Sequence, residues 1–164
     1  MVSSQVVGYV VLVGIGATAV MDAWLLFLSR LGVPIASFGL IGRWIGHMPR
    51  GRFAHPAISK AQPVAFELLL GWLTHYLIGI AYAGLLLAVL GVAWLEQPTY
   101  LPAVAFGALT VAAPWFVMQP AMGAGFAASK TPTPLKNCLR SLANHAVFGT
   151  GLYLAAAALD RVMR

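Results

Sequence analysis

Long runs of apolar residues alternate with polar segments along the chain. A helix that crosses the hydrocarbon core of a bilayer needs about 20 consecutive, mostly apolar residues. Four runs reach that length, and they lie at 5–29, 66–91, 100–122 and 138–159. The pattern predicts an all-α, polytopic membrane protein with four transmembrane helices in a single domain, 1–164.

The composition agrees with a location in the membrane. Hydrophobic residues make up 60% of the 164 positions and charged residues only 9%, whereas a soluble domain contains about 25% charged residues. Ten Lys and Arg against four Asp and Glu give a formal net charge of +6. Such an excess suits either nucleic acid or an anionic membrane surface, and the placement of the basic residues decides between these partners.

Basic residues are concentrated in two of the three predicted loops. The loop 91–100 has none, whereas the other two contain Arg30, Arg43, Arg50, Arg52, Lys60, Lys130 and Lys136. Positively charged loops stay in the cytoplasm, so we expect both termini to face outward and 30–65 to be a basic cytoplasmic loop. Because the charge serves as an orientation signal, we expect the lipid bilayer and no nucleic acid as a partner.

Short sequence matches recur in the same order in the two halves of the chain. GATAVMDAW at 16–24 and GALTVAAPW at 107–115 agree at four of nine positions. Two later matches follow, FAHPAISKAQP with FAASKTP and HYLIG with HAVFG. The matches predict two helical hairpins that repeat in parallel about an axis along the membrane normal.

Strongly polar residues inside the spans fall in the half that we expect to face the cytoplasm. Asp22 is the most unusual, because a carboxylate at the centre of a bilayer costs about 2.5 to 3.5 kcal/mol on insertion scales. Small residues on the same helices permit close approach of the backbones. We therefore predict a cytoplasm-facing intramembrane site for a small ligand, an ion or a proton. Its residues are Asp22, Glu67, His75, Gln119 and His145.

The two carboxylates of this site also have structural interpretations. Asp22 can hydrogen-bond to a neighbouring helix or pair with Arg43 or Lys60 from the long loop. Glu67 lies at a helix start, where a carboxylate caps the backbone or interacts favourably with the helix dipole. For both residues the structural and the ligand-binding interpretation stay open.

His75 and His145 occupy equivalent positions of the predicted repeat. Two imidazoles on two helices of a bundle suit axial ligation of haem or, with a carboxylate, binding of a divalent metal ion. Plain hydrogen bonds between helices explain them equally well. The single cysteine, Cys138, excludes a cysteine-rich metal site.

The long loop combines arginines with aromatic residues in GRWIGHMPRGRFAHP, 42–56. Arg43, Arg50 and Arg52 are candidates for contact with an anionic lipid headgroup. The alternative is that they only set the orientation and anchor the loop at the interface.

Two prolines interrupt the third apolar run. Pro114 and Pro120 lack a backbone N–H and clash with the preceding turn, so we expect them to kink or break this helix. Carbonyl groups that lose their partners in this way can line a polar cavity within the membrane.

The motifs GATAVMDAW, FAHPAISKAQPVAFE, PWFVMQPAMGAGFAASKTP and NHAVFGTGLY resemble a bacterial family of small four-helix inner-membrane proteins of unknown function. The resemblance extends over nearly the whole chain. It implies a multi-pass protein of the bacterial inner membrane, and it implies no activity, substrate or site residue.

Three hypotheses of function follow. The leading one is a membrane protein that binds or moves a small ligand, an ion or a proton, as a homo-oligomer or with a membrane-protein partner. The second is a haem- or metal-binding membrane protein that uses His75 and His145. The third is a non-catalytic subunit of a larger membrane complex. An enzyme is the least supported class, because the sequence contains no phosphate loop or dinucleotide fingerprint.

Overall fold

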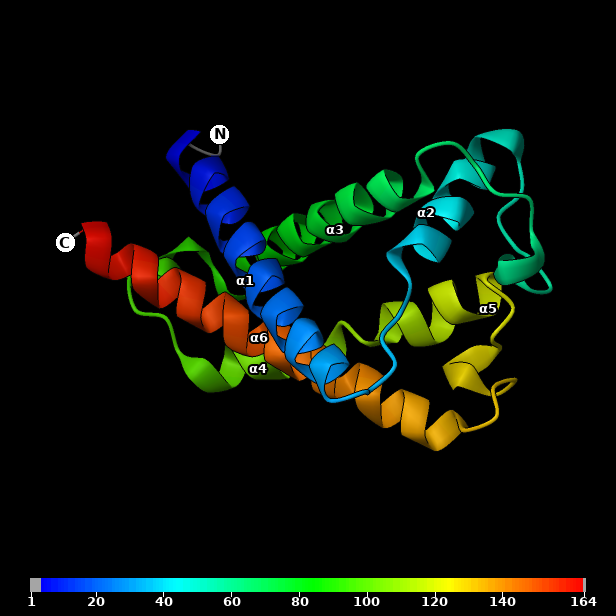
Figure 1. Ribbon diagram of the computed structural model, residues 1–164. Helices are drawn as coiled ribbons and strands as arrows, with labels where there is room; N and C mark the ends of the chain where they lie inside the picture. The colour runs from blue at the N-terminus through cyan, green and yellow to red at the C-terminus, as the bar shows by residue number, and fades with distance from the viewer. Residues whose placement is uncertain (1–3, 164) are drawn as a thin grey trace. The chain divides into compact units, whose positions relative to one another are not determined.

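The structure is a computed structural model that describes residues 4–163 (Figure 1). These residues form helices and turns, and no strand occurs among them. The long helices are α1, α3 and α6, and α4 continues through η4 into α5 as one helical segment of 22 residues. In chain order the elements are α1 (Ser4–Arg30), α2 (Phe38–His47), η1 (Met48–Arg50), η2 (Ile58–Lys60), α3 (Glu67–Leu90), η3 (Val92–Leu95), α4 (Tyr100–Leu109), η4 (Pro114–Met118), α5 (Gln119–Ala121), η5 (Phe126–Ala128) and α6 (Pro134–Met163).

Four helical segments are long and apolar enough to cross a membrane, which confirms the four predicted spans. They are Ser4–Arg30, Glu67–Leu90, Tyr100–Ala121 and Pro134–Val162. The first three begin and end within one residue of the predicted bounds. The fourth begins four residues before the predicted start, because Pro134 suits the first turn of a helix, where its missing N–H would have no partner in any case.

The loop predicted at 30–65 contains a helix that the sequence analysis missed. α2 covers Phe38–His47, and the 3-10 turns η1 and η2 follow it. A helix of 10 residues is too short to cross the bilayer. A search for long apolar runs therefore does not detect it.

The third span is interrupted, as the two prolines predict. α4 ends at Leu109, and the chain continues as a π-helical turn, η4, followed by α5. Because Pro114 cannot donate to the carbonyl of Thr110, the regular ladder stops there. The Thr110 amide still completes α4 by bonding back to the carbonyls of Phe106 and Gly107, at 3.1 Å each.

The contacts divide the described chain into two compact units. Unit 1 comprises 4–34, 76–110 and 143–163, and unit 2 comprises Ile35–His75 and Val111–Leu142. Unit 1 has an apolar core of buried side chains from all its helices, among them Val13, Ala17, Leu86, Ala103, Leu152 and Ala156.

Glycines bring the helices of unit 1 into backbone contact. A Cβ added to Gly107 on α4 would overlap the backbone of Gly149 on α6, and one added to Gly14 on α1 would overlap the backbone of Ile80 on α3. Small residues at such crossings are the usual basis of helix association in membranes. They fix the spacing at which side chains of neighbouring helices meet.

In unit 2, α2 packs against the start of α3. A Cβ on Gly42 would overlap the backbone carbonyl of Glu67, and one on Gly71 would overlap that of Phe38. The segment that leads into α3 lies along the same face of α2, where Gly46 lies against the side chain of Val64. α2 is therefore held closely by the segment that leads into α3.

Candidate functional site

Three hydrogen bonds between side chains join the four candidate spans in pairs within unit 1. Tyr76 on α3 donates to Asp22 on α1, with 2.8 Å between Oη and Oδ2. Trp24, two residues along α1, donates from Nε1 to Oδ1 of Asn144 on α6 at 3.0 Å. We call this set, completed by the pair described next, the polar layer: Asp22, Trp24, Tyr76, Thr110, Asn144 and His145.

The remaining pair joins Thr110, at the end of α4, to His145 on α6. Thr110 Oγ1 lies 2.7 Å from His145 Nδ1 and also donates to the carbonyl of Gly107 at 2.6 Å. A hydroxyl has a single proton, and a carbonyl oxygen can only accept. His145 therefore donates from Nδ1 to Thr110.

Asp22 on α1 is thus hydrogen-bonded to α3, as its structural interpretation in the sequence analysis required. Arg43, one of the two basic partners considered for Asp22, binds Glu67. A donated hydrogen bond from a phenol stabilises an ionised carboxylate more than it would a neutral acceptor. This contact explains how a carboxylate is tolerated within a membrane-spanning helix.

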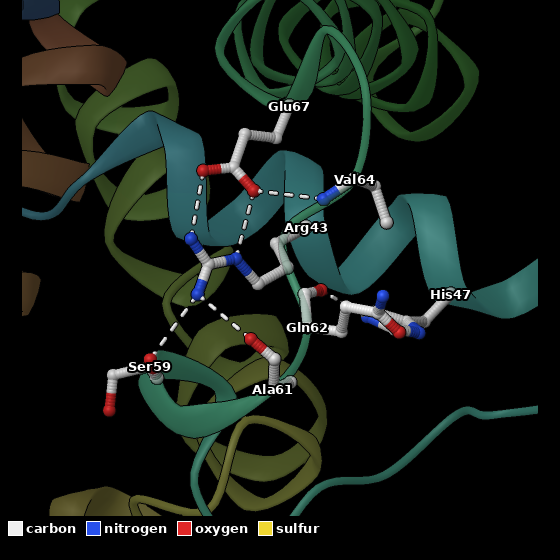
Figure 2. Close-up of polar contacts among 7 residues, drawn as sticks. All are labelled: Arg43, His47, Ser59, Ala61, Gln62, Val64 and Glu67. Atoms are coloured by element: carbon white, nitrogen blue, oxygen red, sulfur yellow. Dashed lines mark hydrogen bonds and ion pairs between the residues drawn. The ribbon is translucent and has the colours of Figure 1, made fainter.

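Arg43 and Glu67 form the most connected polar contact of unit 2 (Figure 2). The guanidinium binds both carboxylate oxygens, with Nε to Oε2 at 2.8 Å and Nη2 to Oε1 at 2.9 Å. Nη1 donates to the carbonyls of Ser59 and Ala61 at 3.2 and 3.1 Å. The hydrogen bond to Glu67 raises the pKa of Arg43, although partial burial opposes the shift. The pair connects α2, the segment around η2 and the start of α3.

Glu67 also has the role at the helix start that the sequence analysis considered. Its Oε2 accepts from the backbone N–H of Val64 at 3.3 Å, three residues earlier. A glutamate side chain that accepts from a backbone N–H three residues earlier, at the start of a helix, forms one half of a capping box. One carboxylate thereby fixes the first turn of α3 and holds Arg43.

The other two predicted site residues of unit 2 have apolar or buried surroundings. The ring of His75 packs against Phe38 and Trp72, with centroids 4.7 and 5.9 Å apart. Gln119, the first residue of α5, has a buried Oε1 with no hydrogen-bond partner in the part of the chain that the structure describes. Of the five predicted residues, Asp22 and His145 take part in two separate hydrogen-bonded pairs of the polar layer. The single five-residue site stays a prediction.

The predicted cofactor and headgroup contacts also stay predictions. His75 belongs to unit 2 and His145 to unit 1. Within 4–163 no group of three or more His, Cys, Asp or Glu is arranged to hold a metal ion. Among the three arginines, Arg50 and Arg52 are exposed, whereas the side chain of Arg43 is only 12% exposed and is occupied by Glu67.

Sequence reasoning missed the partners that complete the polar layer. Tyr76, Trp24 and Thr110 were not assigned to the site, because aromatic and Thr residues are common in apolar helices. Their signal was a hydrogen-bonding group inside an apolar run, which needs a partner when it is removed from water. The sequence does not say which helix supplies that partner.

A family model described as a protein of unknown function, DUF2938, matches residues 11–159. The chain belongs to this family. The match includes most of the first and fourth candidate spans and everything between them. No curated protein and no solved structure matches the chain.

Proposed function

We propose that this member of the DUF2938 family binds and releases a proton or a small cation at Asp22 in the polar layer. The observation that carries the proposal is the hydrogen bond of 2.8 Å from Tyr76 to the Asp22 carboxylate, inside a membrane span. Ionisable residues in spans are rare because they are costly, and they mark ion pathways and proton relays.

The rest of the polar layer supplies the groups that such a site needs. The ring of His145 is held by its hydrogen bond to Thr110, and imidazole exchanges protons near neutral pH. Trp24 and Asn144 hold α1 and α6 together beside Asp22. A proton or cation at Asp22 then changes the charge that Tyr76 stabilises, which couples occupancy of the site to the contact between α1 and α3.

Proton binding is tested on the purified full chain in detergent by infrared difference spectroscopy across a pH titration. We expect a protonated-carboxyl band that is present in wild type and in Asp160→Asn and absent in Asp22→Asn. Tyr76→Phe should shift the midpoint of this band, because the hydrogen-bond donor to the carboxylate is lost. A carboxyl signal that is unchanged in Asp22→Asn would refute the proposal.

Movement across the membrane is tested in liposomes that contain the purified protein and a trapped pH-sensitive dye. A potassium diffusion potential drives protons inward, and a parallel series uses a trapped sodium-sensitive dye and an inward sodium gradient. We expect flux in wild type and in Asp160→Asn and none in Asp22→Asn. Titration of Asp22 without flux of either ion would restrict the protein to binding, and flux that persists in Asp22→Asn would exclude Asp22 from the path.

A further inference from the structure

Two histidines of unit 2 lie side by side outside the membrane-spanning helices. His47 is the last residue of α2, and His55 lies on the segment between η1 and η2. Their ring centroids are 4.9 Å apart, and the rings meet edge to face at 62°. His47 is only 3% exposed. This pair differs from His75 and His145, which the sequence analysis considered as metal ligands.

The hydrogen bond of His47 identifies the ring nitrogen that carries the proton. Nε2 lies 2.9 Å from the backbone carbonyl of Gln62 (Figure 2), and a carbonyl oxygen only accepts, so Nε2 is the donor. Nδ1 is then the ring nitrogen that is left to bind a ligand. Nδ1 is buried and has no hydrogen-bond partner among residues 4–163.

The second ring presents a buried nitrogen in the same way. Nε2 of His55 is buried and has no hydrogen-bond partner within the described chain. Burial lowers the pKa of His55, and the charges of His47 and Arg52 lower it further. His55 is therefore neutral at neutral pH, and neutral imidazole is the form that binds metal ions.

Backbone contacts hold His55 in place beside His47. The His55 amide donates to the carbonyl of Ala121 at 2.7 Å. Gly123 adopts φ +93°, and a Cβ there would overlap the carbonyls of Pro56 and His55, so only glycine permits this approach. The position of the ring is thus set by the main chain of unit 2.

We propose that His47 and His55 bind a late first-row transition-metal ion, with Cu²⁺ bound most tightly. A histidine that donates one N–H to a backbone carbonyl and presents its other nitrogen has the arrangement of metal-ligating histidines. Imidazole suits Cu, Zn and Ni, and the affinity of nitrogen sites is highest for Cu²⁺. No third His, Cys, Asp or Glu joins the pair in the described chain, so water or carbonyl oxygen fills the other positions.

The test is a Cu²⁺ titration of the purified full chain, without a histidine tag, followed by electron paramagnetic resonance. The chain has four histidines, so His47→Gln and His55→Gln have matched controls in His75→Gln and His145→Gln. We expect one Cu²⁺ per chain with nitrogen couplings from two imidazoles in wild type and in both controls. Each site variant should weaken binding at least tenfold and leave one coupled imidazole.

Two results would overturn the proposal. One is a wild-type protein that binds no stoichiometric Cu²⁺, and the other is binding that is lost only in the control variants. Circular dichroism of each variant separates loss of the site from loss of the fold. If His47→Gln does not fold, His55→Gln decides, because its ring is only half-buried and its fixing contacts come from the backbone.

Discussion

Gly107→Ala should separate the two helices that hold His145 in the polar layer. A Cβ at Gly107 would lie 2.5 Å from the backbone N of Gly149 and 2.7 Å from the carbonyl oxygen of His145, whereas ordinary contacts begin at 3.4 Å. Backbone atoms cannot rotate away, so α4 and α6 must move apart by about 0.9 Å. The distance between Thr110 and His145 would then grow from 2.7 Å to about 3.6 Å, which is no longer a hydrogen bond.

The expected loss of stability combines three contributions. Overpacking an interface costs about 1 to 3 kcal/mol, and loss of an interhelical hydrogen bond in a membrane protein costs about 0.6 kcal/mol on average. Helix propensity acts in the opposite direction, because Ala is favoured over Gly by about 1 kcal/mol. We therefore expect Gly107→Ala to lower the free energy of unfolding by about 0.6 to 2.6 kcal/mol.

The assay is reversible unfolding in mixed micelles of increasing dodecyl sulfate content, followed by circular dichroism. Gly8→Ala is the matched control, because no atom lies within 4 Å of a Cβ at Gly8 on α1. This control should leave stability unchanged or raise it by up to about 1 kcal/mol. Gly107→Ala should therefore lower the free energy of unfolding, whereas Gly8→Ala should not. Equal stabilities would refute the close backbone approach of Gly107 and Gly149.

Three further predictions concern the other polar contacts. A double-mutant cycle of Asp22→Asn and Tyr76→Phe should give a coupling energy of about 0.6 to 1.7 kcal/mol, the range measured for hydrogen bonds between membrane helices, and additive effects would exclude the contact. Arg43→Lys should lower the unfolding temperature because an ammonium cannot bind both carboxylate oxygens, whereas exposed Arg50→Lys should leave it unchanged; equal effects would contradict the bidentate pair. Because the pKa of His55 is lowered in the folded protein, the unfolded chain takes up its proton first as pH falls. Stability should therefore decrease below about pH 6.5, and His55→Gln should weaken this dependence, measured as unfolding temperature against pH; an identical pH profile in His55→Gln would show that other groups cause it.

The sequence predicted the membrane-spanning segments closely because hydropathy adds up along a continuous run of residues. The interruption of the third span was predictable for a similar reason, since the missing N–H of Pro114 acts on its own turn. α2 was not found, because a helix of 10 residues that packs on a neighbouring segment has no long apolar run. Its evidence lies in contacts such as Gly42 against the backbone of Glu67.

The candidate site divides in the same way between local and non-local information. The cost of a carboxylate in lipid shows from the sequence alone that Asp22 needs a partner. The sequence does not show that Tyr76 is this partner. Arg43 illustrates the difficulty, because the sequence analysis considered it as a partner of Asp22 and of a lipid headgroup, and not of Glu67. The approach of α2 to the start of α3 places its guanidinium on Glu67.

What the sequence alone determined is the number of spans, the approximate place of each in the chain, and the presence of ionisable groups that need partners inside them. These properties depend on residues that are near one another in the chain. The tertiary structure decided the pairs Asp22 with Tyr76, Thr110 with His145, and His47 with His55. Each pair depends on how two separate segments are rotated and how far apart they lie. Contacts between glycines and the backbone of a neighbouring segment set this spacing. No pattern of nearby residues in the sequence specifies it.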